Sequence, residues 1–201
     1  GNILYTLNTQ NGIQNNTILS LFVDNSENLW LGLDNGIDFV EVNSPLSYIG
    51  SDKMGTGYCC RVFEGNLYLG TNQGLYMVPY KSKATTADPE LVEKTAGQVW
   101  TLEEFAGQLF CGHNQGTYLI SGRKAEKICN EEGAWKFIPV HGRPDLVIGG
   151  YYEGLLLFRM KNGRWEYDKK VKGFNESSRY LFQDAKGFLW VGHSGKGIFR
   201  L

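Results

Sequence analysis

The sequence has no apolar run long enough to cross a membrane and no tract of basic residues. A membrane-spanning helix needs about 20 consecutive apolar residues, so nothing in these 201 residues predicts insertion into a bilayer. The 20 Lys and Arg nearly balance the 21 Asp and Glu, which gives nucleic-acid binding little support. The first residues also lack the charged and apolar regions of a signal peptide.

Cysteines are few, and their spacing matches no zinc or redox motif. Cys59 and Cys60 are adjacent, whereas Cys111 and Cys129 stand alone. Adjacent residues of a strand point to opposite faces of a sheet, so we interpret all four cysteines as small residues that fill space in the core or at the surface. The sequence also has no Ser-His-Asp arrangement, P-loop or nucleotide-binding glycine motif. It therefore predicts no catalytic residue and no cofactor.

Glycine and aromatic residues are abundant instead, with 26 Gly, 5 Trp, 11 Tyr and 11 Phe. Aromatic residues favour strands and glycine favours turns, which predicts an all-β protein. One hairpin pattern recurs, most clearly in "LWLGLDNGIDFV", "LYLGTNQGLYMV" and "LFCGHNQGTYLI". Its first glycine, which we call the marker glycine, occurs five times at intervals of 38, 42, 38 and 42 residues: Gly32, Gly70, Gly112, Gly150 and Gly192. Such a period is typical of a β-propeller.

Each copy predicts a blade of four antiparallel strands, A to D in chain order. The expected blades, all in a single propeller domain or fragment, are residues 17–50, 57–94, 97–129, 134–170 and 177–201. The last copy lacks strand D, and we predict that residues 2–8 supply it, with residues 3–7 pairing with residues 197–201 to close a five-bladed ring. Closure would remove an exposed sheet edge. The alternative is an open arc of a larger propeller.

Aromatic residues recur two positions before four of the marker glycines. Trp30, Tyr68, Phe110 and Trp190 therefore occupy equivalent sites in strand B. Repeated aromatic residues usually serve packing, so we expect these side chains to fill the seams between blades.

The turns between strands B and C would gather at one end of the propeller. Amide and aromatic side chains there suit a sugar, because its hydroxyls need donors and acceptors while its C–H faces pack on rings. Asn, Gln and Gly are also ordinary turn residues. The candidate ligand-binding residues are Asn35, Asn72, Gln73, Asn114, Gln115, Tyr151, Tyr152, Glu153 and His193.

Histidines and carboxylates are the candidate residues for a metal site or a catalytic acid pair. His113 and His193 follow marker glycines on non-adjacent blades, and His141 falls near the opposite end, so too few ligands converge for a metal. Asp24, Glu104 and Asp184 each precede a marker glycine by eight residues. We interpret these carboxylates as caps of A–B turns rather than as the acid pair of a glycosidase.

Two segments resemble a known repeat. "NGIQNNTILSLFVDNSENLWLGLDNGIDFV", residues 11–40, and "FQDAKGFLWVGHSGKGIFRL", residues 182–201, are similar to the two-component regulator propeller repeat. That repeat builds the periplasmic sensor region of hybrid two-component regulators. The resemblance implies a periplasmic location and recognition of oligosaccharides from complex polysaccharides. The kinase of such proteins would lie outside these residues.

The predicted function is therefore a non-enzymatic, extracytoplasmic ligand-sensing module of a two-component signalling protein. The expected partners are an oligosaccharide or other small ligand, neighbouring propeller or sensor domains of the same protein, and a second copy of the chain. One alternative is a propeller glycoside hydrolase or lyase, which needs converging carboxylates. Another is a purely structural protein-interaction propeller.

Overall fold

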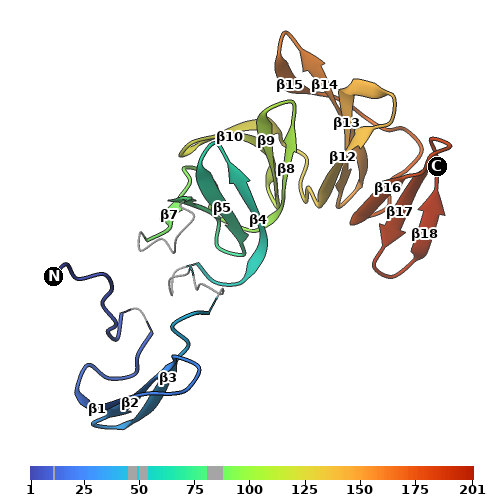
Figure 1. Ribbon diagram of the computed structural model, residues 1–201. Coiled ribbons are helices and arrows are strands. Elements are labelled where there is room, and N and C mark those ends of the chain that lie inside the picture. The colour runs from blue at the N-terminus through green and yellow to red at the C-terminus, as the bar shows by residue number, and fades with distance from the viewer. Residues whose placement is uncertain (11, 45–48, 50–53, 81–87) are drawn as a thin grey trace. The chain divides into compact units, whose positions relative to one another are not determined.

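The computed structural model describes residues 1–10, 12–44, 49, 54–80 and 88–201. The described residues form eighteen strands in five antiparallel sheets and contain no helix (Figure 1), which confirms the predicted all-β class. The chain divides into two compact units, Gly1–Tyr48 and Ile49–Leu201. We describe each unit by itself.

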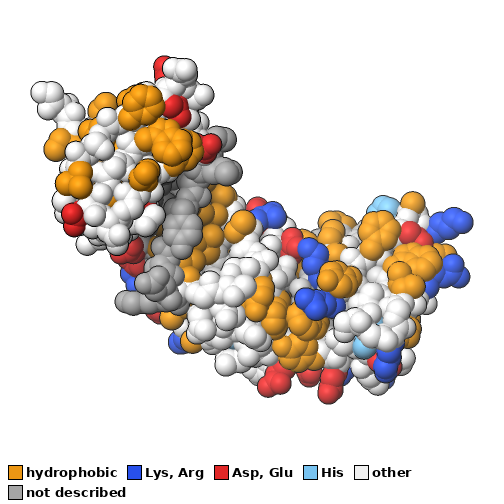
Figure 2. All heavy atoms as spheres, turned by 90° about the horizontal axis from the view of Figure 1, so that it is seen from below, with side chains coloured by type: hydrophobic (Ala, Val, Ile, Leu, Met, Phe, Trp, Pro, Cys, Tyr) orange, Lys and Arg blue, Asp and Glu red, His pale blue; other side chains and the backbone are white. Residues whose placement is uncertain are grey.

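The first unit is built around one three-stranded sheet. Its strands follow the chain: β1 (Ile18–Val23), β2 (Leu29–Leu33) and β3 (Gly36–Val40). Ile13, Leu31 and Leu33 form a small core, whereas Phe22, 64% exposed, and Ile37, 68% exposed, remain at the surface. Hydrophobic side chains are accordingly visible on this unit in Figure 2. The strand D predicted at residues 46–50 lies almost entirely outside the described residues.

The second unit contains four sheets, each a meander in chain order as the repeat predicts. The first sheet has β4 (Gly57–Phe63), β5 (Asn66–Thr71), β6 (Leu75–Pro79) and β7 (Glu90–Leu91). The second has β8 (Val99–Phe105), β9 (Gln108–His113), β10 (Gly116–Ser121) and β11 (Lys124–Cys129). The third has β12 (Lys136–Val140), β13 (Arg143–Tyr151), β14 (Gly154–Lys161) and β15 (Arg164–Lys170). The fourth has β16 (Tyr180–Gln183), β17 (Leu189–His193) and β18 (Gly197–Arg200).

The four sheets of this unit face one another in sequence like propeller blades. Inner strand β4 contacts β8, β8 contacts β12, and β12 contacts β16. The hydrophobic core is accordingly divided into three seams between successive sheets. Stacking of this kind buries sheet faces that one isolated sheet would leave in water.

The repeated aromatic residues of strand B differ in how deeply they are buried. Tyr68 and Phe110 are fully buried in seams, as predicted. Trp30 is 43% exposed and Trp190 is half-buried. Each of these two indoles donates its N–H to a carboxylate of an A–B turn, at 3.1 Å to Asp24 and 2.9 Å to Asp184.

The marker glycines allow close approach of strands. A Cβ added at Gly112 would lie 2.5 Å from the carbonyl oxygen of Ala134, which leads into the next blade. Cysteines fill the same seams: Cys111 and Cys129 are buried and all four thiols are free. Burial raises the pKa of Cys59 to about 12, so this thiol stays neutral and acts as a packing group.

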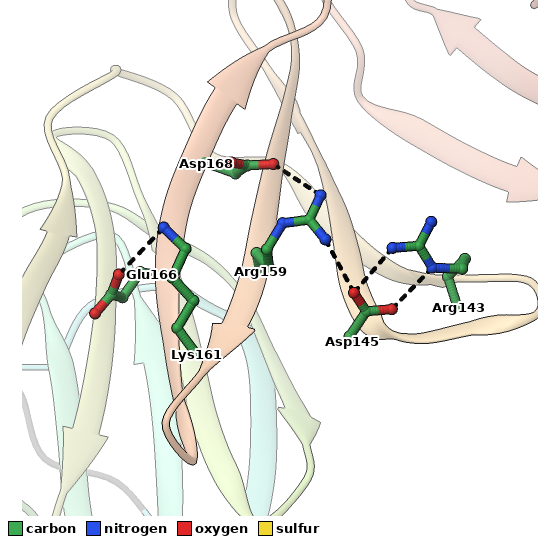
Figure 3. A network of polar contacts seen from close by, with 6 residues as sticks. All are labelled: Arg143, Asp145, Arg159, Lys161, Glu166 and Asp168. Atoms are coloured by element: carbon green, nitrogen blue, oxygen red, sulfur yellow. Dashed lines mark hydrogen bonds and ion pairs between the residues drawn. The ribbon is translucent and has the colours of Figure 1, made fainter.

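Ion pairs join the outer strands of the third sheet. Arg159 on β14 bridges Asp145 on β13, at 3.0 Å, and Asp168 on β15, at 3.2 Å (Figure 3). Arg143 adds a second cation at 2.9 Å from Asp145, and its hydrogen bond lowers the pKa of that carboxyl. These contacts fasten three neighbouring strands through their side chains.

Closure by the N-terminal segment is not seen among the described residues. Residues 3–7 form no strand, and β18 pairs with β17 alone. The expected pairing of residues 3–7 with residues 197–201, and with it the five-bladed ring, stays a prediction.

Candidate functional site

The B–C turns of the second unit lie beside the segments that lead into strand A. Asn72 shows how the two are joined: its N–H donates to the carbonyl oxygen of Thr56 at 3.0 Å, and its Oδ1 accepts the Thr56 N–H at 2.8 Å. Asn114 makes the same pair of bonds with Gln98, at 2.8 and 2.9 Å. The side-chain oxygens of Asn72 and Asn114 are therefore occupied by hydrogen bonds that join the B–C turn to the segment before strand A.

The same turns are also hydrogen-bonded to the following blade. Gly97 donates its N–H to the Gln73 carbonyl at 3.2 Å, and Gly133 to the Asn114 carbonyl at 3.0 Å. Ser178 donates to the Tyr151 carbonyl at 2.9 Å. The first three B–C turns of the second unit are thus each tied to the following blade, which stiffens this end of the unit.

The two equivalent histidines cap their turns. His113 Nδ1 accepts the N–H of Gln115 at 3.0 Å, and its Nε2–H donates to the Thr95 carbonyl at 3.2 Å. His193 Nδ1 accepts two N–H groups, from Gly195 at 2.9 Å and Lys196 at 3.0 Å. In the described part of the chain, no three His, Cys, Asp or Glu side chains converge as metal ligands would.

The two adjacent tyrosines of the fourth copy differ in burial. Tyr151 is 1% exposed, and its hydroxyl bonds Thr117 inside the seam, because the side chain points between two blades. Tyr152 is half-buried, and its ring lies over Gly133 and 5.3 Å from Trp135. Of the pair, Tyr152 alone has surface to offer a ligand.

The remaining candidates are exposed turn residues. Gln73, Gln115 and Glu153 lie at the B–C end of the second unit, and Asn35 lies in the β2–β3 turn of the first unit. The carboxylates of Asp24 and Asp184 accept backbone N–H groups of A–B turns.

Four further side chains form a row that the sequence pattern did not reveal. Each lies on an inner strand or directly before it, one residue ahead of the partner of a marker glycine. Ring centroids are 5.0 Å apart between Tyr58 and Trp100, and 4.4 Å between Trp100 and Trp135. The guanidinium of Arg179 stacks 4.8 Å from the Trp135 ring. We call Tyr58, Trp100, Trp135 and Arg179 the aromatic row.

A β-bulge explains how the row leaves the sheets. The register shifts between Gly57 and Cys59, and again between Val99 and Thr101. The extra residues, Tyr58 and Trp100, have no partner on strand B, and a bulge of this kind re-aims a side chain. The row therefore lies at the strand A ends beside the B–C turns, with Tyr58 and Arg179 exposed and both tryptophans half-buried.

Polar groups of the row lack partners within the described residues. The indole N–H groups of Trp100 and Trp135 are buried and have no hydrogen-bond acceptor there. No described carboxylate pairs with Arg179, whereas Lys136 pairs with Glu103 and Lys196 pairs with Glu176. An unpaired buried donor is uncommon in folded proteins and calls for an explanation.

Sequence reasoning missed the row because its spacing is irregular. Tyr58 and Trp100 precede their marker glycines by 12 residues, but Trp135 and Arg179 precede theirs by 15 and 13. A count back from the marker glycine therefore does not place the four residues at equivalent positions. The four residues align only when each is counted from the inner-strand partner of its marker glycine, which the pairing of the strands defines.

Similarity to known proteins is confined to structure. No family model and no curated protein matches the sequence. The extracellular domain of a proposed one-component system from B. thetaiotaomicron has a TM-score of 0.63 at 16% identity, covering 94% of this chain and 30% of that chain. The extracellular domain of a proposed hybrid two-component system from the same organism has a TM-score of 0.57 at 15% identity, covering 92% and 27%.

A third neighbour is the WD40 β-propeller domain of Doa1, with a TM-score of 0.51 at 15% identity, covering 90% of this chain and 60% of that chain. Identities this low establish the fold alone: the sheets are those of β-propeller blades. The chain spans about 30% of the length of the two bacterial neighbours. In the described part of the chain, no helix has the length and hydropathy of a membrane span.

Proposed function

We propose that the chain is part of an extracytoplasmic ligand-sensing module of a two-component signalling protein, and that its ligand is an oligosaccharide. The observation that carries this proposal is the aromatic row. Its partly exposed rings stack on one another across successive blades, and apolar ring surface beside a few polar groups is what a sugar ring requires.

The fold supports the sensing role. The two bacterial structures above are extracellular domains of signalling systems, and a blade stack held by hydrogen-bonded turns is a stable support for a binding face. Ligand binding acts on signalling by favouring one arrangement of domains over another. The periplasm is the compartment where a saccharide would be met.

A thermal-shift screen with oligosaccharides tests the proposal. A ligand at 100 times its Kd stabilises the folded state by about 2.7 kcal/mol, which raises the melting temperature of a domain of this size by several degrees. We expect one glycan class to produce such a shift, and the Trp100→Ala, Trp135→Ala double variant to lose it. Phe182→Ala, at an exposed residue of β16, is the control.

Two results would contradict the proposal. A melting temperature unchanged by every glycan would favour a structural protein-interaction propeller. Release of reducing sugar at enzyme-like rates would favour a glycoside hydrolase or lyase instead, because a sensor returns its ligand intact.

A further inference from the structure

Resting on the proposed function, we propose that the aromatic row binds a saccharide chain that carries an isolated acidic group. In this arrangement the sugar rings lie along Tyr58, Trp100 and Trp135, and the guanidinium of Arg179 holds the carboxylate or sulfate. Four features support this arrangement: the unpaired guanidinium of Arg179, the contacts between successive rings, the two indole N–H groups without acceptors, and the charge of the surrounding side chains.

Arg179 is positioned as an anion receptor. Its guanidinium lies 4.8 Å from the centroid of Trp135 and 5.7 Å from that of Tyr180, and no described carboxylate neutralises it. Stacking holds the plane of the group while the N–H bonds at its edge stay free. Those bonds form a fork that matches the two oxygens of a carboxylate or the oxygens of a sulfate.

The rings form one continuous stack rather than separate pockets, because centroid distances of 5.0 and 4.4 Å are too short for rings that lie edge to edge. Tyr58 is tilted 35° to Trp100, and Trp100 is tilted 37° to Trp135. Tyr152 extends the aromatic surface, since its ring lies 5.3 Å from Trp135. A stack across three successive blades fits a chain of several sugar units better than a monosaccharide.

The indole N–H groups indicate that the row changes on binding. Both are buried against neighbouring groups without an acceptor among the described residues, which raises the free energy of the unliganded state. A small rotation of Trp100 or Trp135 would bring its N–H to an oxygen of the ligand. Binding should therefore alter the fluorescence of these tryptophans.

The surrounding charge restricts the kind of acid. Glu131 and Glu132 precede Gly133, and Glu153 lies in the adjacent B–C turn, all three exposed. These carboxylates would repel a densely charged polyanion at this end of the third sheet. The favoured ligand is consequently a chain with one localised acidic group beside otherwise neutral sugar surface.

The test compares saccharides that differ only in the acid. Binding to the whole chain is measured by calorimetry and tryptophan fluorescence with glucuronic-acid-substituted xylotetraose and a monosulfated galactan tetrasaccharide. Their neutral counterparts are the unsubstituted xylotetraose and the desulfated tetrasaccharide. We expect one acidic member to bind at least tenfold more tightly than its counterpart, with a change in fluorescence; the arm that responds tells carboxylate from sulfate.

Three variants test whether Arg179 causes the preference for the acidic saccharide. Arg179→Gln should remove the tenfold preference, so that the acidic member binds no more tightly than its neutral counterpart. Arg179→Lys should retain part of the preference, because charge remains but the planar fork is lost. Arg123→Gln is the matched control: Arg123 lies in the β10–β11 turn at the other end of its blade and pairs with Glu90.

The failures are distinguishable. If neutral and acidic members bind equally, or if Arg179→Gln leaves the preference intact, the acidic subsite is wrong while saccharide sensing stands. If no acidic member binds but a neutral glycan does, the acidic subsite is equally wrong. If no saccharide of any kind binds, the proposed function itself fails.

Discussion

At the scale of single residues, His113 is a histidine that the fold requires to be neutral. Burial lowers its pKa from the ordinary value of 6.5. Its two ring nitrogens are matched to one acceptor and one donor, the Thr95 carbonyl and the Gln115 N–H. A proton added at Nδ1 would face that N–H and break the cap.

The first prediction is a loss of stability in mild acid. The unfolded chain binds the histidine proton at a higher pH than the folded chain, so the contribution of His113 is complete above pH 6.5 and declines as the pH falls toward the lowered folded pKa. We expect the free energy of unfolding to fall between pH 7 and pH 5.5. Chemical denaturation at several pH values measures it.

Two variants test whether His113 causes this pH dependence. His113→Asn should be less stable at pH 7 but should lose less stability on acidification. His141→Gln, at an exposed site, should keep the dependence of the parent chain. An unchanged slope in His113→Asn would show that another group titrates.

Gly133 supports the aromatic row through its backbone. Its φ is +74° and a Cβ there would overlap the ring of Tyr152, whereas Gly142 has a φ of +71° with open space around it. A left-handed conformation costs a non-glycine residue about 1–2 kcal/mol, so Gly142→Ala measures that strain alone. We expect Gly133→Ala to lose at least about 1 kcal/mol more, from crowding against Tyr152. Denaturant unfolding of the two variants would contradict this if their losses were equal.

At the scale of elements, the seams between sheets carry the stability of the second unit. Phe110 is fully buried, with ring centroids 5.3 Å from Phe137, 5.6 Å from Phe158 and 5.8 Å from Trp165. Phe110→Ala would leave a cavity between the second and third sheets, and we expect a loss of about 3–5 kcal/mol. Phe182→Ala, at a residue that is 65% exposed, should lose far less. Equal losses in thermal or denaturant unfolding would mean that the seam is not the stabilising element.

The hairpins were predictable because their chemistry is local. Glycine turns and alternating apolar residues are readable within a dozen residues, and strands β5 with β6 and β9 with β10 lie where the pattern puts them. Cys59, Tyr68 and Phe110 were likewise interpreted correctly as packing residues.

The aromatic row, which is the proposed binding face, was only partly predictable, for a physical reason. A bulge depends on how one strand registers against its neighbour, which the local sequence does not specify, so Tyr58 and Trp100 were overlooked. Tyr151 and Tyr152 are adjacent in sequence, but the pleat sends the first into a seam and leaves the second at the surface. Composition favours the end of the blade where the aromatic row lies, and the binding role of that end stays a prediction.

At the scale of the whole molecule, residues 49–201 contain three hydrophobic seams, each built from described residues of this unit. We therefore predict that residues 49–201 fold alone, with a cooperative melting transition close to that of the whole chain. Circular dichroism and calorimetry measure it. A large loss of stability, reproduced by deleting residues 1–8 alone, would instead support ring closure by residues 3–7.

The hydrogen bonds that tie each B–C turn to the next blade have an evolutionary consequence. The backbone N–H groups of Gly97, Gly133 and Ser178 each donate to the turn of the preceding blade, so these bonds join immediate neighbours. Duplication or loss of one repeat in the gene leaves every remaining junction intact. Each added copy also brings one more inner-strand position to the aromatic row, so the row lengthens one blade at a time.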